Sequence, residues 1–98
     1  MKGIIIEPGK EPVVTTLPDT LQGAEAWLGG PADQKYFSRT PAILLHSAAG
    51  REPNRIWRGE VLCGTILCYG WRNNRFRDLN KALQVEMLDR LKDTEVRV

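Results

Sequence analysis

Fixed positive charge is concentrated in the middle third of this 98-residue chain. Residues 51–77 carry six arginines and two acidic side chains, a net charge of +4, and contain no lysine. Residues 1–50 and residues 78–98 each carry four basic and five acidic side chains, a net charge of −1. An arginine presents a planar fork of donors that suits a carboxylate or a phosphate, and it also stacks on aromatic rings. The middle of the chain is therefore the candidate region for binding an anion.

Aromatic side chains are interleaved with these arginines in two segments, residues 54–58 and residues 69–77. Single-stranded nucleic acid is bound by this combination, because the charges follow its backbone while the rings stack on its bases. A nucleotide ligand would use the same chemistry. An acidic protein partner would use it too, since Trp, Tyr and Arg dominate interface hot spots. The predicted binding residues are Asn54, Arg55, Trp57, Arg58, Tyr69, Trp71, Arg72, Arg75 and Arg77.

A purely structural interpretation of the same segments stays open. The rings of a small domain mostly fill its core, and the arginines would then pair with nearby carboxylates. Asn54 and Arg55 pose the same choice on a smaller scale, because they would either bind an anion or tie a loop to the sheet. The rings concerned are Trp57, Tyr69 and Phe76, and the carboxylates are Glu52, Glu60 and Asp78.

The sequence offers few groups for catalysis. Nucleophilic catalysis needs a nucleophile, a base and an orienting group within hydrogen-bond reach. The single histidine, His46, ends an apolar run, Cys63 and Cys68 have the character of small core residues, and no Gly-x-Ser-x-Gly elbow occurs. We therefore predict that the protein is not an enzyme and has no catalytic residues.

Metal and phosphate sites are also not predicted. Cys63 and Cys68 lack the paired spacing of a zinc clamp, and His46 is distant from them in the sequence. Gly9-Lys10 lacks the spacing of a phosphate-binding loop and reads as the turn of a hairpin, with Gly9 at positive φ. The expected cofactor and metal content is none.

The elements that must position these residues can be read from the apolar pattern. Residues 3–6 and 13–17 are predicted to be strands joined by a tight turn, and a short helix capped by Asp19 or Thr20 should end at Gly29-Gly30. Further along the chain we expect an edge strand or a loop over residues 31–40, a buried strand over 42–46 and a connection over 47–55. A central strand should follow over residues 60–69, interrupted at Gly64. After a turn at Asn73-Asn74, a final helix should begin at about residue 79 with Asp78 or Asn80 as its cap.

This order predicts an α+β fold in which a mixed sheet of four or five strands is accompanied by two helices. The length allows one domain, residues 1–98. No stretch reaches the roughly 18 apolar residues that span a bilayer, and no secretory signal is recognisable. A cytoplasmic protein with free thiols and no membrane partner is expected. An exposed sheet edge near Val13 or Tyr36 leaves a homo-oligomer open.

Several different short motifs are distributed along most of the chain. They are Glu7-Pro8-Gly9-Lys10 after an apolar strand, Gly29-Gly30 after a short helix, Asn54-Arg55 after a Pro-containing loop, Gly64-Thr65 and Gly70 within and at the end of an apolar strand, and Phe76 and Leu79 before the final helix. Through these motifs residues 2–17 and 54–91 resemble a family known only as domain of unknown function three-eight-four-six. The chain departs from that family at Asn80-Lys81-Ala82, where the family favours Thr or Ser followed by Asp and Glu.

The resemblance implies a setting rather than an activity. The family occurs in phages and mobile elements, largely of Gram-positive bacteria, and it lends no catalytic residue and no ligand. Small accessory proteins of such elements often bind a host factor or nucleic acid. The prediction is therefore a non-enzymatic binding module that engages an acidic macromolecule, with a protein as the partner. A single-stranded nucleic-acid binder and a nucleotide-sequestering binder are the alternatives.

Overall fold

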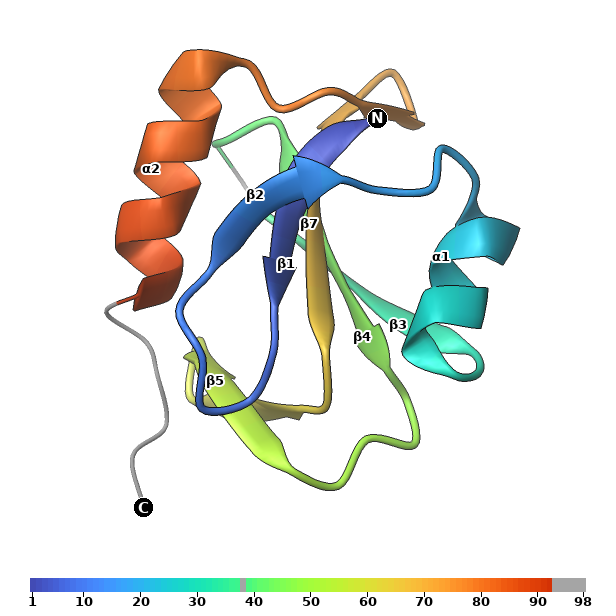
Figure 1. The fold of residues 1–98 in the computed structure, drawn as a ribbon. Coiled ribbons are helices and arrows are strands. Elements are labelled where there is room, and N and C mark those ends of the chain that lie inside the picture. The colour runs from blue at the N-terminus through green and yellow to red at the C-terminus, as the bar shows by residue number, and fades with distance from the viewer. Residues whose placement is uncertain (38, 93–98) are drawn as a thin grey trace.

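One antiparallel sheet of six strands forms the centre of the molecule, and a helix packs on each of its faces (Figure 1). The computed structural model describes residues 1–37 and 39–92. The strand order is β2-β1-β7-β4-β3, and β8 also pairs with β7, while β5 and β6 form a separate hairpin. The elements are β1 (Lys2–Ile6), β2 (Val13–Thr16), α1 (Leu21–Leu28), β3 (Ala32–Tyr36), β4 (Ala42–Ser47), β5 (Pro53–Trp57), β6 (Glu60–Cys63), β7 (Ile66–Arg72), β8 (Arg75–Arg77) and α2 (Lys81–Lys92).

The predicted α+β class with two helices is confirmed, but the sheet is larger than the four or five strands expected. The expectation of a mixed sheet was wrong in detail, because every strand pairing in the described ranges is antiparallel. Parallel neighbours need a long crossover connection. The chain has such a connection through α1, but it joins β2 to β3, which lie at opposite edges of the sheet.

The predicted central strand over residues 60–69 is two strands. Gly64 takes the left-handed conformation, with φ of 77°, and the chain turns there so that β6 leaves the sheet to pair with β5. The remainder, β7, is buried on both faces from Ile66 to Gly70. The sequence therefore indicated the burial of β7 correctly and placed its irregularity at the right residue, but not the separate hairpin.

Alternation along the strands divides the core between the two helices. On one face Leu44, Ile66 and Cys68 pack with Met87 and Leu91 of α2. On the other face the neighbouring strand positions pack with Ala24 and Leu28 of α1; they are Ile43, Leu45, Leu67 and Tyr69. The long strand β7 thus contributes side chains to both halves of the core. Its C-terminal end pairs with β8 at one edge of the molecule.

Both helices begin at predicted caps. The Thr20 hydroxyl accepts a hydrogen bond from the Gly23 N–H, and the Asn80 Oδ1 accepts one from the Leu83 N–H. Gly29 ends α1 in the left-handed conformation, as expected. In the described ranges neither helix is long and apolar enough to cross a membrane.

Candidate binding surface

The structure separates the predicted binding residues into interior and exposed groups. Asn54 and Arg55 lie in the interior, with exposed fractions of 0% and 1%. The Asn54 Nδ2 donates hydrogen bonds to the carbonyl oxygens of Ile6 (2.9 Å) and Gly64 (2.8 Å). Asn54 therefore ties β5 to β1 and to the turn between β6 and β7, and its inclusion in an exposed binding surface was wrong.

Arg55 is held by carbonyl groups from three parts of the chain. Its Nε donates to the Leu91 oxygen (2.6 Å), its Nη1 to the Asn54 oxygen (3.0 Å) and the Asn54 Oδ1 (2.9 Å), and its Nη2 to the Lys10 oxygen (2.9 Å). The guanidinium joins β5, the β1–β2 turn and the end of α2. This is the structural role that the sequence left open, and it excludes Arg55 from a surface site.

Tyr69 is also interior, contrary to the predicted surface. Its ring stacks on Phe76 with centroids 4.7 Å apart, and its hydroxyl donates to the Pro18 oxygen (2.6 Å). Burial, helped by the nearby Asp19 carboxylate, raises the pKa of Tyr69 to about 12. Tyr69 therefore anchors the segment before α1 to the sheet.

Trp57 and Arg58 lie on the β5–β6 hairpin, apart from the other predicted residues. The Trp57 ring packs edge-on against Phe37, 4.4 Å between centroids, and the Arg58 guanidinium lies 4.9 Å from the Trp57 centroid. Arg58 occupies a turn position with φ of 48°. Together with Arg90 these residues line a small hollow of about 200 Å³ that shares no residue with the region around β8.

The β7–β8 hairpin carries the remaining predicted residues on the surface. Its two-residue turn, Asn73-Asn74, has φ values of 54° and 57°, the positive angles that tight hairpins require. In register, Arg72 faces Arg75 and Gly70 faces Arg77, so the three arginines lie on one side of the hairpin. All three side chains are exposed, and half-buried Trp71 pairs with Phe76 on the other side.

The carboxylates proposed as partners of these arginines are engaged elsewhere or lie apart. Glu60 pairs with Lys35 (3.1 Å), and the Asp78 Oδ1 accepts the Lys2 N–H (2.7 Å). Within residues 1–37 and 39–92, Arg72, Arg75 and Arg77 form no ion pair. No carboxylate among the described residues therefore neutralises these three positive charges.

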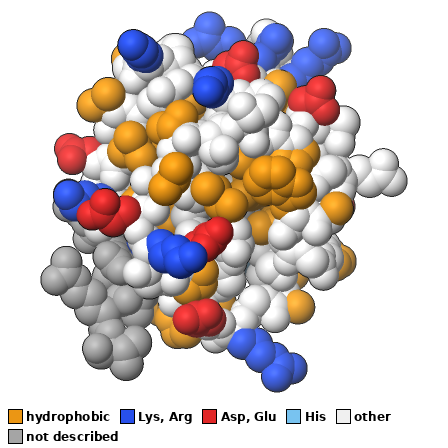
Figure 2. All heavy atoms as spheres, viewed as in Figure 1, with side chains coloured by type: hydrophobic (Ala, Val, Ile, Leu, Met, Phe, Trp, Pro, Cys, Tyr) orange, Lys and Arg blue, Asp and Glu red, His pale blue; other side chains and the backbone are white. Residues whose placement is uncertain are grey.

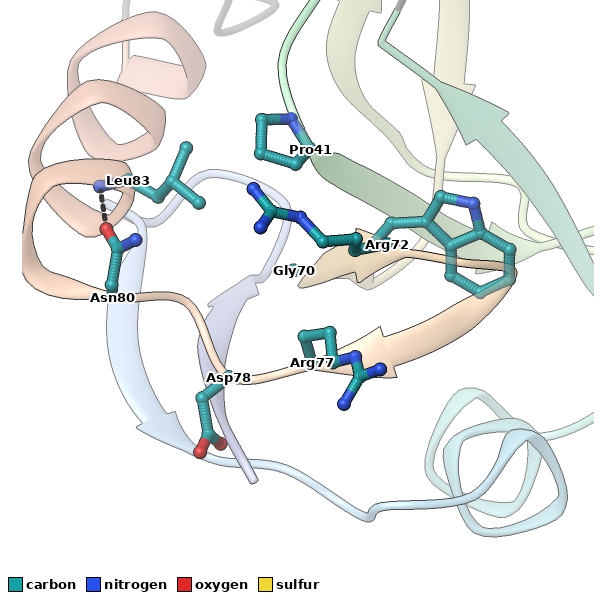
Figure 3. Close-up of a pocket in the computed structure, with 8 residues that line it drawn as sticks. Pro41, Gly70, Arg72, Arg77, Asp78, Asn80 and Leu83 are labelled. Carbon is teal, nitrogen blue, oxygen red and sulfur yellow. Dashed lines mark hydrogen bonds between the residues drawn. The ribbon is translucent and has the colours of Figure 1, made fainter.

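Figure 2 shows Lys and Arg side chains along the upper edge of the molecule, where Figure 1 places β8 and the start of α2. Close by is a half-open pocket of about 330 Å³. In Figure 3 the Arg72 side chain extends across this pocket towards Pro41 and the first turn of α2. We call Trp71, Arg72, Arg75 and Arg77 the hairpin patch.

His46 is buried in β4, and neither of its ring nitrogens has a hydrogen-bond partner among the described residues. Burial lowers the pKa of His46 from its ordinary value of 6.5, and Lys35 acts in the same direction, whereas Asp33, Glu60 and the Ser47 backbone act against it. The imidazole is therefore neutral at pH 7.

Acid should therefore destabilise the fold through His46. The folded protein binds a proton on His46 less well than the unfolded chain does. The contribution of neutral His46 to stability is therefore fully present above about pH 6.5, and it decreases as the pH falls towards the lowered pKa. Urea unfolding at about pH 7.5 and about pH 5.5 measures the loss, and His46→Leu should reduce it. An unchanged pH dependence in that variant would contradict the assignment.

The two cysteines are free thiols in separate surroundings. Cys68 is buried against the α2 side of the sheet, and burial raises the pKa of its thiol to about 12, so its thiolate is scarce at neutral pH. Cys63 is half-buried at the end of β6. In the part of the chain that the structure describes, no three His, Cys, Asp or Glu side chains are grouped to hold a metal ion.

Two surface residues near the hairpin patch were not among the predicted binding residues. Tyr36 of β3 packs its ring 5.6 Å from Trp71, and Leu21 opens α1 beside the hairpin. The signal for Tyr36 was present, because it is an aromatic residue in an otherwise polar edge strand. Leu21 gave no such signal, since its position depends on how α1 packs against the sheet.

Comparison with known proteins identifies the family of the chain. No curated protein and no solved structure matches it. The family model described as Domain of unknown function (DUF3846) matches residues 1–92. That range takes in the hairpin patch and all ten of the helices and strands that the structure describes. The chain therefore belongs to the DUF3846 family of domains of unknown function.

Proposed function

We propose that this protein is a non-enzymatic binding module that holds an acidic macromolecule, a protein rather than a nucleic acid, on its hairpin patch. The proposal includes a phage or mobile-element origin and action in the cytoplasm, where Cys63 and Cys68 would stay reduced. The observation that carries it is the collection of three exposed arginines, without a described carboxylate partner, on one side of a tight hairpin.

The register of the β7–β8 hairpin places these arginines close together, which destabilises the hairpin in the isolated protein. Arg72 and Arg75 are directly opposite each other, and like charges in that position destabilise a pair of strands. An acidic partner would relieve the repulsion and would use the planar donor forks of the arginines. This favours recognition of carboxylates over a purely structural role.

The rings near the arginines favour a protein over single-stranded nucleic acid. A strand of bases needs several free ring faces in succession. Tyr69 is buried, and Trp71 is covered in part by Tyr36 and Phe76, whose centroids lie 5.6 and 5.5 Å from it. The patch therefore offers charge and one accessible aromatic corner, which suits a protein interface better than a stack of bases.

The test is the affinity for an oligoglutamate peptide, measured by fluorescence anisotropy at low salt. We expect Arg72→Ala, Arg75→Ala and Arg77→Ala together to weaken binding about tenfold or more, since each exposed charge pair contributes up to about 1 kcal/mol. A matched variant replaces Lys10, Arg51 and Lys92 with Ala. It removes the same charge from exposed positions outside the hairpin patch and should bind almost normally.

Equal losses in the two triple variants would show attraction by net charge alone and would contradict the proposal. An oligoglutamine peptide should bind to neither. An oligothymidylate probe bound more tightly than oligoglutamate, with a steep fall in affinity as salt rises, would favour the nucleic-acid alternative instead. Circular dichroism of each variant establishes that the fold is retained.

A further inference from the structure

A groove adjoins the hairpin patch on the α1 side of the sheet. It has a volume of about 450 Å³, within the range of ligand pockets. Trp71 and Phe76 contribute their rings, tilted by 60° with centroids 5.5 Å apart, and Leu21 contributes an apolar side chain from α1. The groove therefore has an apolar part, which the hairpin and α1 build together, beside the polar side chains of Thr20, Gln34 and Asn74.

Apolar surface is left open at this groove. Leu21 is 38% exposed, and Tyr36, whose ring lies 5.6 Å from that of Trp71, is 48% exposed. Isolated exposed apolar residues are common, but here two of them stand beside half-buried rings that border a groove. Covering these groups with an apolar side chain would remove the exposed surface from water.

The charges around the groove indicate what kind of chain would supply that side chain. Arg75 lines the groove, and Arg72 faces Arg75 in the register of the hairpin. Asp19 lines the groove as well, whereas Arg72 and Arg77 line the pocket on the α2 side of the hairpin, so the groove itself holds one positive and one negative charge. The acidic character of an incoming segment is therefore set by the neighbouring hairpin patch, which shares Trp71 and Arg75 with the groove.

We propose that the groove binds one aromatic or long aliphatic side chain of an acidic segment whose carboxylates pair with the hairpin patch. This inference rests on the proposed function and adds the partner's chemistry: an acidic chain with an apolar anchor. A free anion would leave the apolar part of the groove uncovered, and a basic segment would be repelled by the arginines of the hairpin patch.

Two peptides test the anchor. Both consist of glutamates around one central residue, which is Phe in the first and Ala in the second. The wild-type protein should bind the Phe peptide about tenfold more tightly, because burying the ring removes its apolar surface from water. Leu21→Ala should reduce this ratio to about threefold or less, whereas Leu21→Met, which keeps an apolar side chain, should preserve it. Val85→Ala, at an exposed apolar position on α2, is the control and should leave it unchanged.

The substitution Asp19→Asn gives a second test of where the peptides bind. Removing this carboxylate of the groove should strengthen binding of both acidic peptides, because each would lie beside it. Unchanged or weaker binding in this variant contradicts the inference.

The outcomes separate this inference from the proposal it extends. Equal binding of the Phe and Ala peptides, with both still weakened by the triple arginine substitution, overturns the anchor groove and leaves the hairpin patch intact. A Phe preference that Leu21→Ala does not change also overturns it, because the ring would then bind elsewhere. Loss of the arginine dependence itself overturns the proposed function.

Discussion

Replacing Arg55 with Met should lower the free energy of unfolding by about 3–5 kcal/mol, a large part of the stability of a domain of this size. Met keeps much of the apolar stem but removes every donor of the guanidinium. The carbonyl groups of Lys10, Asn54 and Leu91 then lose the hydrogen bonds that Arg55 gives them in a buried site. Three segments of the chain would lose their common tie at once.

Urea unfolding monitored by tryptophan fluorescence measures this effect. Arg51→Met is the matched control, because Arg51 is exposed four residues away, and it should change stability by less than about 0.5 kcal/mol. Arg55→Lys should recover only part of the loss, since one ammonium cannot reproduce the planar fork. A loss below about 1 kcal/mol in Arg55→Met would show that the buried network contributes little.

Replacing Gly70 with Ala should cost about 2–3 kcal/mol and displace the hairpin patch. A Cβ at this position would lie 2.8 Å from the Asp78 oxygen and 2.9 Å from the Arg77 oxygen. These are backbone atoms, so the clash can be relieved only by moving β8 away from β7. Because Arg77 is carried by β8, oligoglutamate binding should fall together with stability.

Gly59→Ala separates this clash from a general effect of removing a glycine. Gly59 has φ of 81° and open space where a Cβ would stand, so Ala there should cost about 1 kcal/mol through the backbone alone. Binding by the hairpin patch should be unaffected. Gly70→Ala with normal stability and normal binding would mean that β7 and β8 are not in the close contact described.

The parts of the fold that follow from local chemistry were predictable. Asn73-Asn74 tolerates positive φ, so the sequence indicated the turn that presents the arginines. The caps Thr20 and Asn80 and the helix end at Gly29 are similar cases, because neighbouring residues alone determine them. The apolar run of β7 likewise indicated a strand covered on both sides.

The fate of Arg55 could not be predicted in this way. Its partners Lys10 and Leu91 lie 45 and 36 residues away in the sequence, and the site exists only when β5, the β1–β2 turn and α2 meet. In the sequence Arg55 has the same appearance as Arg72, a cation close to a ring. Only the packing shows that one is interior and the other exposed.

The β5–β6 hairpin was missed for a related reason. Its pairing depends on Gly64 turning the chain out of the sheet, and the apolar character of residues 60–69 continues through that turn. This hairpin carries Trp57 and Arg58 away from the hairpin patch. The sequence predicted a single binding surface. In the structure its residues are divided between the hairpin patch, the β5–β6 hairpin and the buried hydrogen bonds of Asn54 and Arg55.

The most direct test of the hairpin patch is a map of backbone amide and indole NMR shifts while the Phe-centred glutamate peptide is added to the wild-type protein. We expect the largest changes on residues 71–77, on Leu21 and on the Trp71 indole, whereas the indole signals of Trp27 and Trp57 should hardly shift. Changes centred instead on Trp57, Arg58 and Arg90, or absent at saturating peptide, would contradict this expectation.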